Sequence, residues 1–277
     1  MRRNNSANII LVLGAVMSIL CSFVLKNVIL GIGVFLVVFG IVLYKQRASF
    51  IASSAVSAYK KGNFEKSFSL YEKAIAIQGC SNMIKIVYAY RLICEGEVSQ
   101  GAKVLGALNT EQMDANERLN YNATNALSIW KQGGLHRAIE IYEALLNEKE
   151  SVLIYETLGY LLICEKDYEK ALAFNLKAVE LYSTNERMQS NLATSYYYLG
   201  QHQEAAKIFK SLIEDYANFP EPYYYYGRLL ETREKYKGAV KYWNMALEKK
   251  FSGIYSLAQE DIQDKINEIE ENMASEA

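Results

Sequence analysis

One spacing constrains this chain more than any other feature. A turn-type residue recurs between amphipathic helical patterns, at successive intervals of 34, 37, 33, 34 and 34 residues. The turn positions are Gly62, Gly96, Gly133, Lys166, Gly200 and Glu234. Periods of this length, with two helices in each, are typical of stacked helical hairpins, so the sequence predicts an all-α solenoid.

The repeated unit has a characteristic order of large and small residues. An aromatic residue and then a small one lie in the first helix; an aromatic residue follows the turn, and two small residues lie in the second helix. The fourth unit contains Tyr155, Leu158, Gly159, Tyr168, Ala171 and Ala178. The sixth contains Tyr223, Tyr226, Gly227, Tyr236, Ala239, Trp243 and Ala246, and the fifth contains Leu192, Ala193, Gly200, Ala205 and Phe209.

This pattern resembles the tetratricopeptide repeat (TPR) family, and the whole chain is similar to membrane-anchored TPR proteins of the bacterial type. The first and third units match clearly, whereas the second is degenerate. The resemblance implies an α-solenoid of about six helix-turn-helix repeats. We expect the solenoid to span residues 48–253, with units 48–81, 82–118, 119–151, 152–185, 186–219 and 220–253.

A last amphipathic pattern follows the sixth unit. Isoleucines at positions 262, 266 and 269 share one helical face, and acidic residues occupy the others. We predict a capping helix over residues 255–273 within a C-terminal segment, 254–277, that ends in an acidic tail. Such a helix covers the open end of a repeat stack, because terminal repeats need a polar outer side.

The first 47 residues differ in composition from the rest. Two uncharged apolar runs, residues 9–25 and 28–44, are separated only by Lys26 and Asn27. Each run is long enough as a helix to cross a thin hydrocarbon core. We predict a membrane anchor over residues 1–47, made of two transmembrane helices that turn at Lys26. The alternative is a cleavable signal peptide, against which the second apolar run argues.

The charges around the apolar runs predict the orientation. Arg2 and Arg3 precede the first run and Lys45 and Arg47 follow the second, whereas only Lys26 lies between them. Basic residues remain on the cytoplasmic side, so we expect a two-pass protein of the cell membrane with its N-terminus and its solenoid in the cytoplasm. Residues 46–59 contain no glycine or proline, which favours a helix continuous with the second span.

Gly14, Ser18 and Ser22 recur at every fourth residue of the first apolar run. Small residues at this spacing allow a second helix to approach closely. The partner helix is either the second span of the same chain, which we favour, or another copy of the protein. The second case would make the protein a homo-oligomer.

The first helices of the repeats carry many aromatic residues at positions that line the concave groove of TPR proteins. By this resemblance we predict a protein-binding groove that includes Tyr59, Tyr90, Trp130, Tyr160, Tyr197, Tyr198, Tyr224 and Arg228. Tyrosine and tryptophan offer a large contact area and a polar group, and they are enriched at binding hot spots. The alternative is that some of these side chains only pack between helices.

The sequence lacks the patterns of other functional classes. There are only two histidines, the four cysteines have no metal-site spacing, and no nucleophile elbow or phosphate loop is present. We therefore predict no catalytic residues, no metal and no cofactor. After residue 47 the chain carries 25 basic and 31 acidic residues, which disfavours binding to nucleic acid.

These observations predict a membrane-tethered adaptor, not an enzyme. Its cytoplasmic groove would bind a protein or peptide partner, and the membrane anchor would confine the search for that partner. The alternative is a self-assembling membrane protein or an accessory subunit of a membrane complex. The TPR resemblance indicates the fold more specifically than the function.

Overall fold

The computed structural model of the chain describes residues 12–24 and 28–275. Every regular element within those residues is a helix, which confirms the predicted all-α class. The chain divides into two compact units, Met1–Tyr88 and Ala89–Ala277, here called the N-terminal and C-terminal units. Each is described below by itself.

The N-terminal unit is built on one long apolar helix. A helix covers residues 12–19 and continues as a π-helical turn, η1 (Leu20–Val24). The long helix α2 (Val28–Lys60) has 33 residues and is followed by α3 (Phe64–Ile75). Within the described residues α2 alone is long and apolar enough to cross a membrane; the apolar stretch Val12–Phe23 is shorter. The proposed turn at Lys26 and Asn27 lies outside the described residues.

Small residues bring the first apolar helix close to α2. The Ser18 hydroxyl donates a hydrogen bond of 2.7 Å to the Gly31 carbonyl. A Cβ atom added to Gly14 would meet the side chain of Val38, and one added to Gly31 would meet Ser22 Oγ. These contacts within the N-terminal unit favour the intramolecular role of Gly14, Ser18 and Ser22 over packing between copies.

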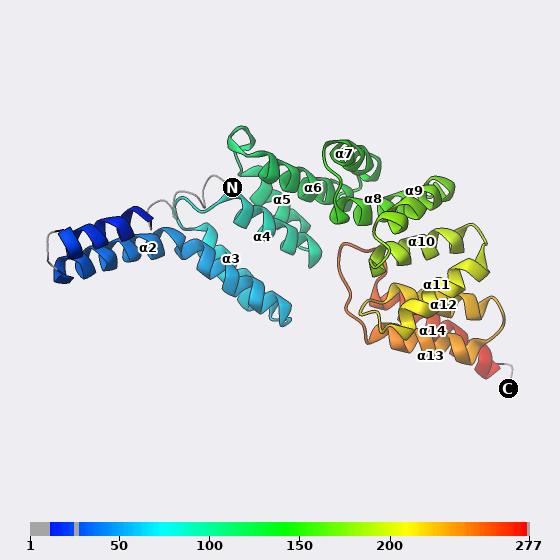
Figure 1. Ribbon diagram of the computed structural model, residues 1–277. Helices are drawn as coiled ribbons and strands as arrows, with labels where there is room; N and C mark the ends of the chain where they lie inside the picture. The colour runs from blue at the N-terminus through cyan, green and yellow to red at the C-terminus, as the bar shows by residue number, and fades with distance from the viewer. Residues whose placement is uncertain (1–11, 25–27, 276–277) are drawn as a thin grey trace. The chain divides into compact units, whose positions relative to one another are not determined.

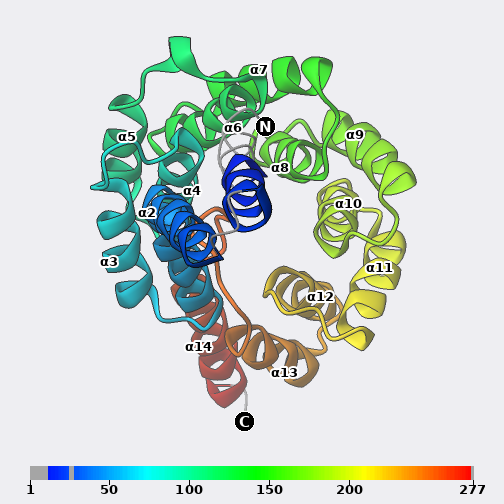
Figure 2. The ribbon, with the colours of Figure 1, turned by 60° about the vertical axis from the view of Figure 1, so that its left-hand side comes forward.

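Helical hairpins make up the rest of the chain (Figure 1). Their helices are α4 (Asn82–Cys94), α5 (Val98–Gly106), α6 (Ala115–Lys131), α7 (Leu135–Glu148), α8 (Val152–Cys164), α9 (Tyr168–Leu181), α10 (Glu186–Tyr198), α11 (His202–Glu214), α12 (Glu221–Glu231) and α13 (Tyr236–Leu247). A 3₁₀ turn, η2 (Thr110–Gln112), lies in the longer interval between the second and third repeats. In the C-terminal unit the first helices α8, α10 and α12 form the inner face and the second helices α9, α11 and α13 lie outside them (Figure 2).

The turn positions explain why the period is so regular. Gly62, Gly96, Gly133 and Gly200 all have positive φ, and so do the two non-glycine turn residues, Lys166 and Glu234, at 66° and 58°. The hairpin turn therefore requires a residue in the left-handed backbone conformation at the same position of every repeat. Two of the six turn residues, Lys166 and Glu234, adopt this conformation without being glycine, so their backbones are strained.

Replacing Lys166 by glycine should therefore raise the free energy of unfolding by about 0.5–1 kcal/mol, because glycine adopts positive φ without steric cost. Chemical denaturation of the purified protein measures the change. Gly200→Ala is the matched control at the equivalent turn: nothing lies within 4 Å of its added Cβ atom, so any loss comes from the backbone alone. A stability gain in Gly200→Ala, or a loss in Lys166→Gly, would contradict this account.

The capping helix differs from its prediction mainly at its N-terminal end, and it ends two residues later than predicted. Helix α14 (Gln259–Ser275) begins four residues later than expected, so Tyr255 and Leu257 precede it. Hydrogen bonds with α8 hold Tyr255 and Ser256 outside the helix, as described below. The apolar face of α14 is confirmed: Ile262, Ile266 and Ile269 are buried in one cluster with Trp243 of α13.

Candidate protein-binding site

Two of the predicted groove residues are packed into the fold. Tyr59 is only 6% exposed, and its ring lies edge-on to Phe64, 5.2 Å away, between α2 and α3. Trp130 is 9% exposed, with its ring 5.8 Å from that of Tyr160. For these two side chains the structure favours the alternative that they pack between helices. Tyr90 is half-buried, and burial raises its pKa.

The remaining predicted tyrosines gather on the C-terminal part of the inner face. Tyr198 is 43% exposed, its ring stacks on Tyr168 at 4.6 Å, and its hydroxyl lies 3.2 Å from that of Tyr225. Tyr197 packs against the same Tyr225 ring at 5.2 Å and stacks on His202. Burial raises the pKa of Tyr225, so its hydroxyl stays protonated and able to donate.

A pocket of about 450 Å³ lies on this part of the inner face. Its walls come from α8, α10, α12, α14 and the segment before α14. Five tyrosines line it: Tyr160, Tyr198, Tyr224, Tyr225 and Tyr255. The pocket is thus aromatic at its walls, but hydroxyls, carboxylates and the Arg187 guanidinium also reach it.

Arg187 of α10 is held on three sides. Its guanidinium carbon lies 4.0 Å from the ring centres of both Phe219 and Tyr255. Its Nη1 donates to Glu221 Oε2 at 3.1 Å. A guanidinium between two aromatic rings gains from cation–π attraction, and the carboxylate neutralises it, so Arg187 joins α10, α12 and the segment before α14.

Glu221, the partner of Arg187, is a buried carboxylate. Burial raises its pKa; the charge of Glu156 adds to this rise, while Arg187 opposes it. The charged form of Glu221 is thus less favourable in the folded chain than in the unfolded one.

This shift predicts a pH dependence of stability. The folded chain keeps the Glu221 proton to a higher pH than the unfolded chain, so the free energy of unfolding falls as pH rises from the ordinary glutamate pKa to the raised one. Glu221→Gln removes this term, so its stability relative to the natural chain should improve over that interval, by up to about 1.4 kcal/mol per pH unit. Denaturation of both proteins between pH 4.5 and 7 measures the difference, and an opposite slope would show that Arg187 dominates.

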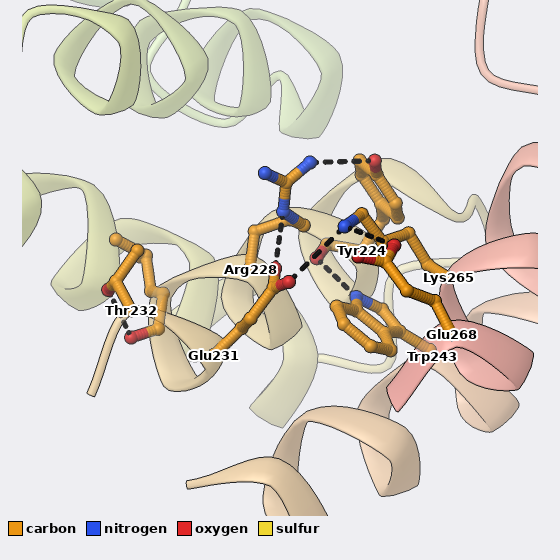
Figure 3. Close-up of polar contacts among 8 residues, drawn as sticks. Tyr224, Arg228, Glu231, Thr232, Trp243, Lys265 and Glu268 are labelled. Atoms are coloured by element: carbon orange, nitrogen blue, oxygen red, sulfur yellow. Dashed lines mark hydrogen bonds and ion pairs between the residues drawn. The ribbon is translucent and has the colours of Figure 1, made fainter. Parts of the chain in front are cut away.

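A polar network joins α12 to α14 at the edge of the pocket (Figure 3). Arg228 donates from Nη1 to the Tyr224 hydroxyl at 3.2 Å and pairs through Nε with Glu231 at 2.7 Å. Lys265 of α14 lies 3.3 Å from Glu231 and 2.7 Å from Glu268. Tyr224 and Arg228, both predicted groove residues, thus help to position the capping helix beside the pocket.

Sequence reasoning missed the segment that precedes α14. Residues 249–258, here called the strap, leave α13 and reach back along the inner face to α8 before α14 begins (Figure 1). The Tyr255 hydroxyl donates to Glu156 at 2.9 Å, the Ser256 amide donates to the Tyr160 hydroxyl at 2.7 Å, and the Gly253 amide donates to the Cys94 carbonyl at 2.7 Å. The available signal was Ser252-Gly253, a turn-type pair just before the predicted cap.

The described residues contain no cluster of histidine, cysteine or acidic side chains that could hold a metal ion. The pocket instead presents aromatic faces, hydroxyl groups and paired charges. These groups suit recognition of a polypeptide or of its side chains.

Comparisons with known proteins agree with the repeat architecture. The family model described as "Tetratricopeptide repeat" matches residues 190–253. A tetratricopeptide repeat protein from Parabacteroides merdae is similar over 92% of this chain and 98% of its own, with 12% identity and a TM-score of 0.65. A thermophilic TPR protein of Thermus thermophilus is similar over 70% of this chain and 99% of its own, with 17% identity and a TM-score of 0.53.

At these identities the two solved structures establish the fold alone, and the family model places the repeat signature on α10 to α13. The left-handed turn residues extend the same architecture to the earlier hairpins. Residues 190–253 therefore match the tetratricopeptide repeat family, and the fold of the chain is similar to that of solved tetratricopeptide repeat proteins.

Proposed function

We propose that this protein is a membrane-tethered adaptor whose inner face, near Tyr198, binds a segment of a protein partner and performs no catalysis. The observation that carries the proposal is the tyrosine-lined pocket of about 450 Å³ on α8, α10 and α12. A purely structural solenoid would gain by filling such a hollow with apolar side chains. Here half-exposed tyrosines and polar groups surround it, as at protein-binding hot spots.

The tether is proposed from the N-terminal unit. Helix α2 is apolar and exposed over its first half and continues as one helix into the first hairpin. Arg47 donates to the Tyr44 carbonyl at 2.6 Å, and its guanidinium lies 3.7 Å from the Tyr44 ring centre. An arginine and a tyrosine at the end of an apolar helix suit the membrane interface, and the basic residues there favour the cytoplasmic side.

Photo-crosslinking in intact cells tests the adaptor role. A photoreactive residue replacing Tyr198 probes the pocket, and one replacing Lys177, exposed on α9, is the control. We expect a discrete adduct with another protein from position 198 only. Adducts of the chain with itself would instead support the self-assembling alternative, and equal adducts from both positions would contradict a binding site at the pocket.

A substitution then tests the same surface quantitatively. Tyr198→Ala should weaken binding of the captured protein about 10- to 30-fold, the loss usual for a hot-spot aromatic residue. Because Tyr198 is 43% exposed, the melting temperature should change little. A large fall in melting temperature would show that Tyr198 is a packing residue instead.

Fractionation of the cells tests the tether and its orientation. We expect the chain to stay with membranes under alkaline carbonate extraction, and the solenoid to resist protease added outside intact cells but not after lysis. Release by carbonate would contradict membrane integration. Digestion from outside would contradict a cytoplasmic solenoid.

A further inference from the structure

The strap lies on the inner face of the repeats, where it contacts α8. It has no regular secondary structure between α13 and α14, and it bonds to α8 through its backbone and one side chain. These contacts join residues 99 and 96 positions apart in the sequence. The strap therefore behaves as a peptide bound to the inner face, although it belongs to the same chain.

Its contacts define what the site recognises. The Tyr255 ring packs edge-on to Tyr160 at 4.7 Å, and the Arg187 guanidinium lies 4.0 Å from its centre. Its hydroxyl donates to Glu156. Two residues earlier, a Cβ atom added to Gly253 would lie 2.7 Å from the Cys94 carbonyl oxygen. The strap thus places a small residue and, two positions later, a tyrosine against the inner face, in a turn in which the Tyr255 amide donates to the Ser252 carbonyl at 3.1 Å.

The strap is held less firmly than the helices on either side. Its residues are half-buried or exposed, whereas α14 has Ile262, Ile266 and Ile269 buried. One side of the strap borders the pocket of about 450 Å³. Another hollow, of about 370 Å³, is lined only by the strap itself and the first two residues of α14. Because the strap borders these hollows and none of its residues is fully buried, it can lift while both flanking helices stay packed.

We infer that the surface formed by Glu156, Tyr160 and Arg187 is a binding site for a partner segment that carries a Gly-x-Tyr sequence in a turn like that of the strap, and that the strap is its resident occupant. This inference rests on the proposed function and names the partner's chemistry. The strap is tethered at both ends, so its effective concentration at the site is high. A partner segment must displace it, which lowers the apparent affinity of the site by the fraction of chains with the strap lifted.

A peptide-binding experiment tests the inference with the full-length protein in detergent. The probe is a fluorescent synthetic peptide with the sequence of residues 249–258, and its control carries alanine in place of the tyrosine. Two variants free the site: Gly253→Val, whose side chain collides with the Cys94 carbonyl, and Tyr255→Ala, which only removes strap contacts. We expect the peptide to bind both variants at least 10-fold more tightly than the natural chain, and the control peptide to bind neither.

The site itself is tested by adding Tyr160→Ala to Tyr255→Ala, which should abolish the gain while the melting temperature stays within a few degrees of that of Tyr255→Ala. Absence of binding to both strap variants would overturn the inference. Equal binding to the natural chain and the variants would also overturn it, because the peptide would then lie elsewhere. Dimers of the natural chain in which Tyr255 of one copy crosslinks to Tyr160 of another would overturn it too, since the occupant would be a second copy.

This experiment and the cellular one can fail separately. Purified chain and peptide suffice here, so binding of the peptide would stand even if no cellular adduct formed at position 198. Conversely, a cellular partner could be captured at position 198 while the peptide binds neither strap variant. That result would contradict the Gly-x-Tyr specificity but still support the adaptor role.

Discussion

Replacing Trp243 by alanine should lower the free energy of unfolding of the C-terminal hairpins by about 3–5 kcal/mol. The indole is fully buried, 0% exposed, in the cluster that also holds Ile262 and Ile266 of α14. Its Nε1 donates to the Tyr224 carbonyl at 3.1 Å, and the ring occupies the space that Gly227 leaves by having no side chain. Truncation therefore loses apolar burial, a hydrogen bond and the contact between three helices.

The loss should be local, because each hairpin of a repeat protein contacts mainly its neighbours. Hydrogen exchange should therefore accelerate in α12, α13 and α14 while α8 stays protected. Leu176→Ala is a matched control for lost apolar surface, since Leu176 is 45% exposed on α9 and should cost less than about 1 kcal/mol. Equal effects of the two substitutions would contradict the assigned role of Trp243.

The repeat framework was predictable because its determinants are local. The turn residues were identified by spacing alone, and Lys166 and Glu234 share the left-handed conformation of the glycines at equivalent places. Helix starts follow from single side chains in the same way. Asp114, for example, accepts a hydrogen bond of 2.9 Å from the Glu117 amide and so caps α6.

The candidate site was predictable only in part. A first-helix position shows that a residue can face the groove, but exposure also depends on what covers it. Tyr198 stays open, whereas Trp130 is buried beside Tyr160. The strap contacts, such as that from Tyr255 to Glu156, join residues 99 positions apart, and no local pattern encodes them. The helical period alone therefore placed the start of the capping helix at residue 255, four residues before α14 begins.

Gly159 of α8 and Asn175 of α9 lie in close contact within the fourth hairpin. The effect of Gly159→Ala on stability should therefore change sign when Asn175 is truncated. A Cβ atom added to Gly159 of α8 would collide with Oδ1 of Asn175, a fully buried side chain of α9. The Asn175 Nδ2 donates to the Gly159 carbonyl at 3.2 Å and to Ser195 Oγ of α10 at 3.1 Å, so the amide cannot move aside without losing these bonds. Gly159→Ala should therefore destabilise the protein by about 1–3 kcal/mol.

In an Asn175→Ala background the same substitution should become stabilising. The truncated side chain no longer occupies the space, and alanine is favoured over glycine in a helix by about 1 kcal/mol. Asn175→Ala alone should cost about 2 kcal/mol through its lost buried hydrogen bonds. The double variant should therefore be more stable than the sum of the two single changes predicts. Chemical denaturation of the four proteins completes the cycle. If Gly159→Ala destabilises both backgrounds equally, the backbone of α8 and not Asn175 requires the glycine. If the stability effect of Gly159→Ala instead changes sign, the Asn175 amide joins three helices and fixes how closely they approach.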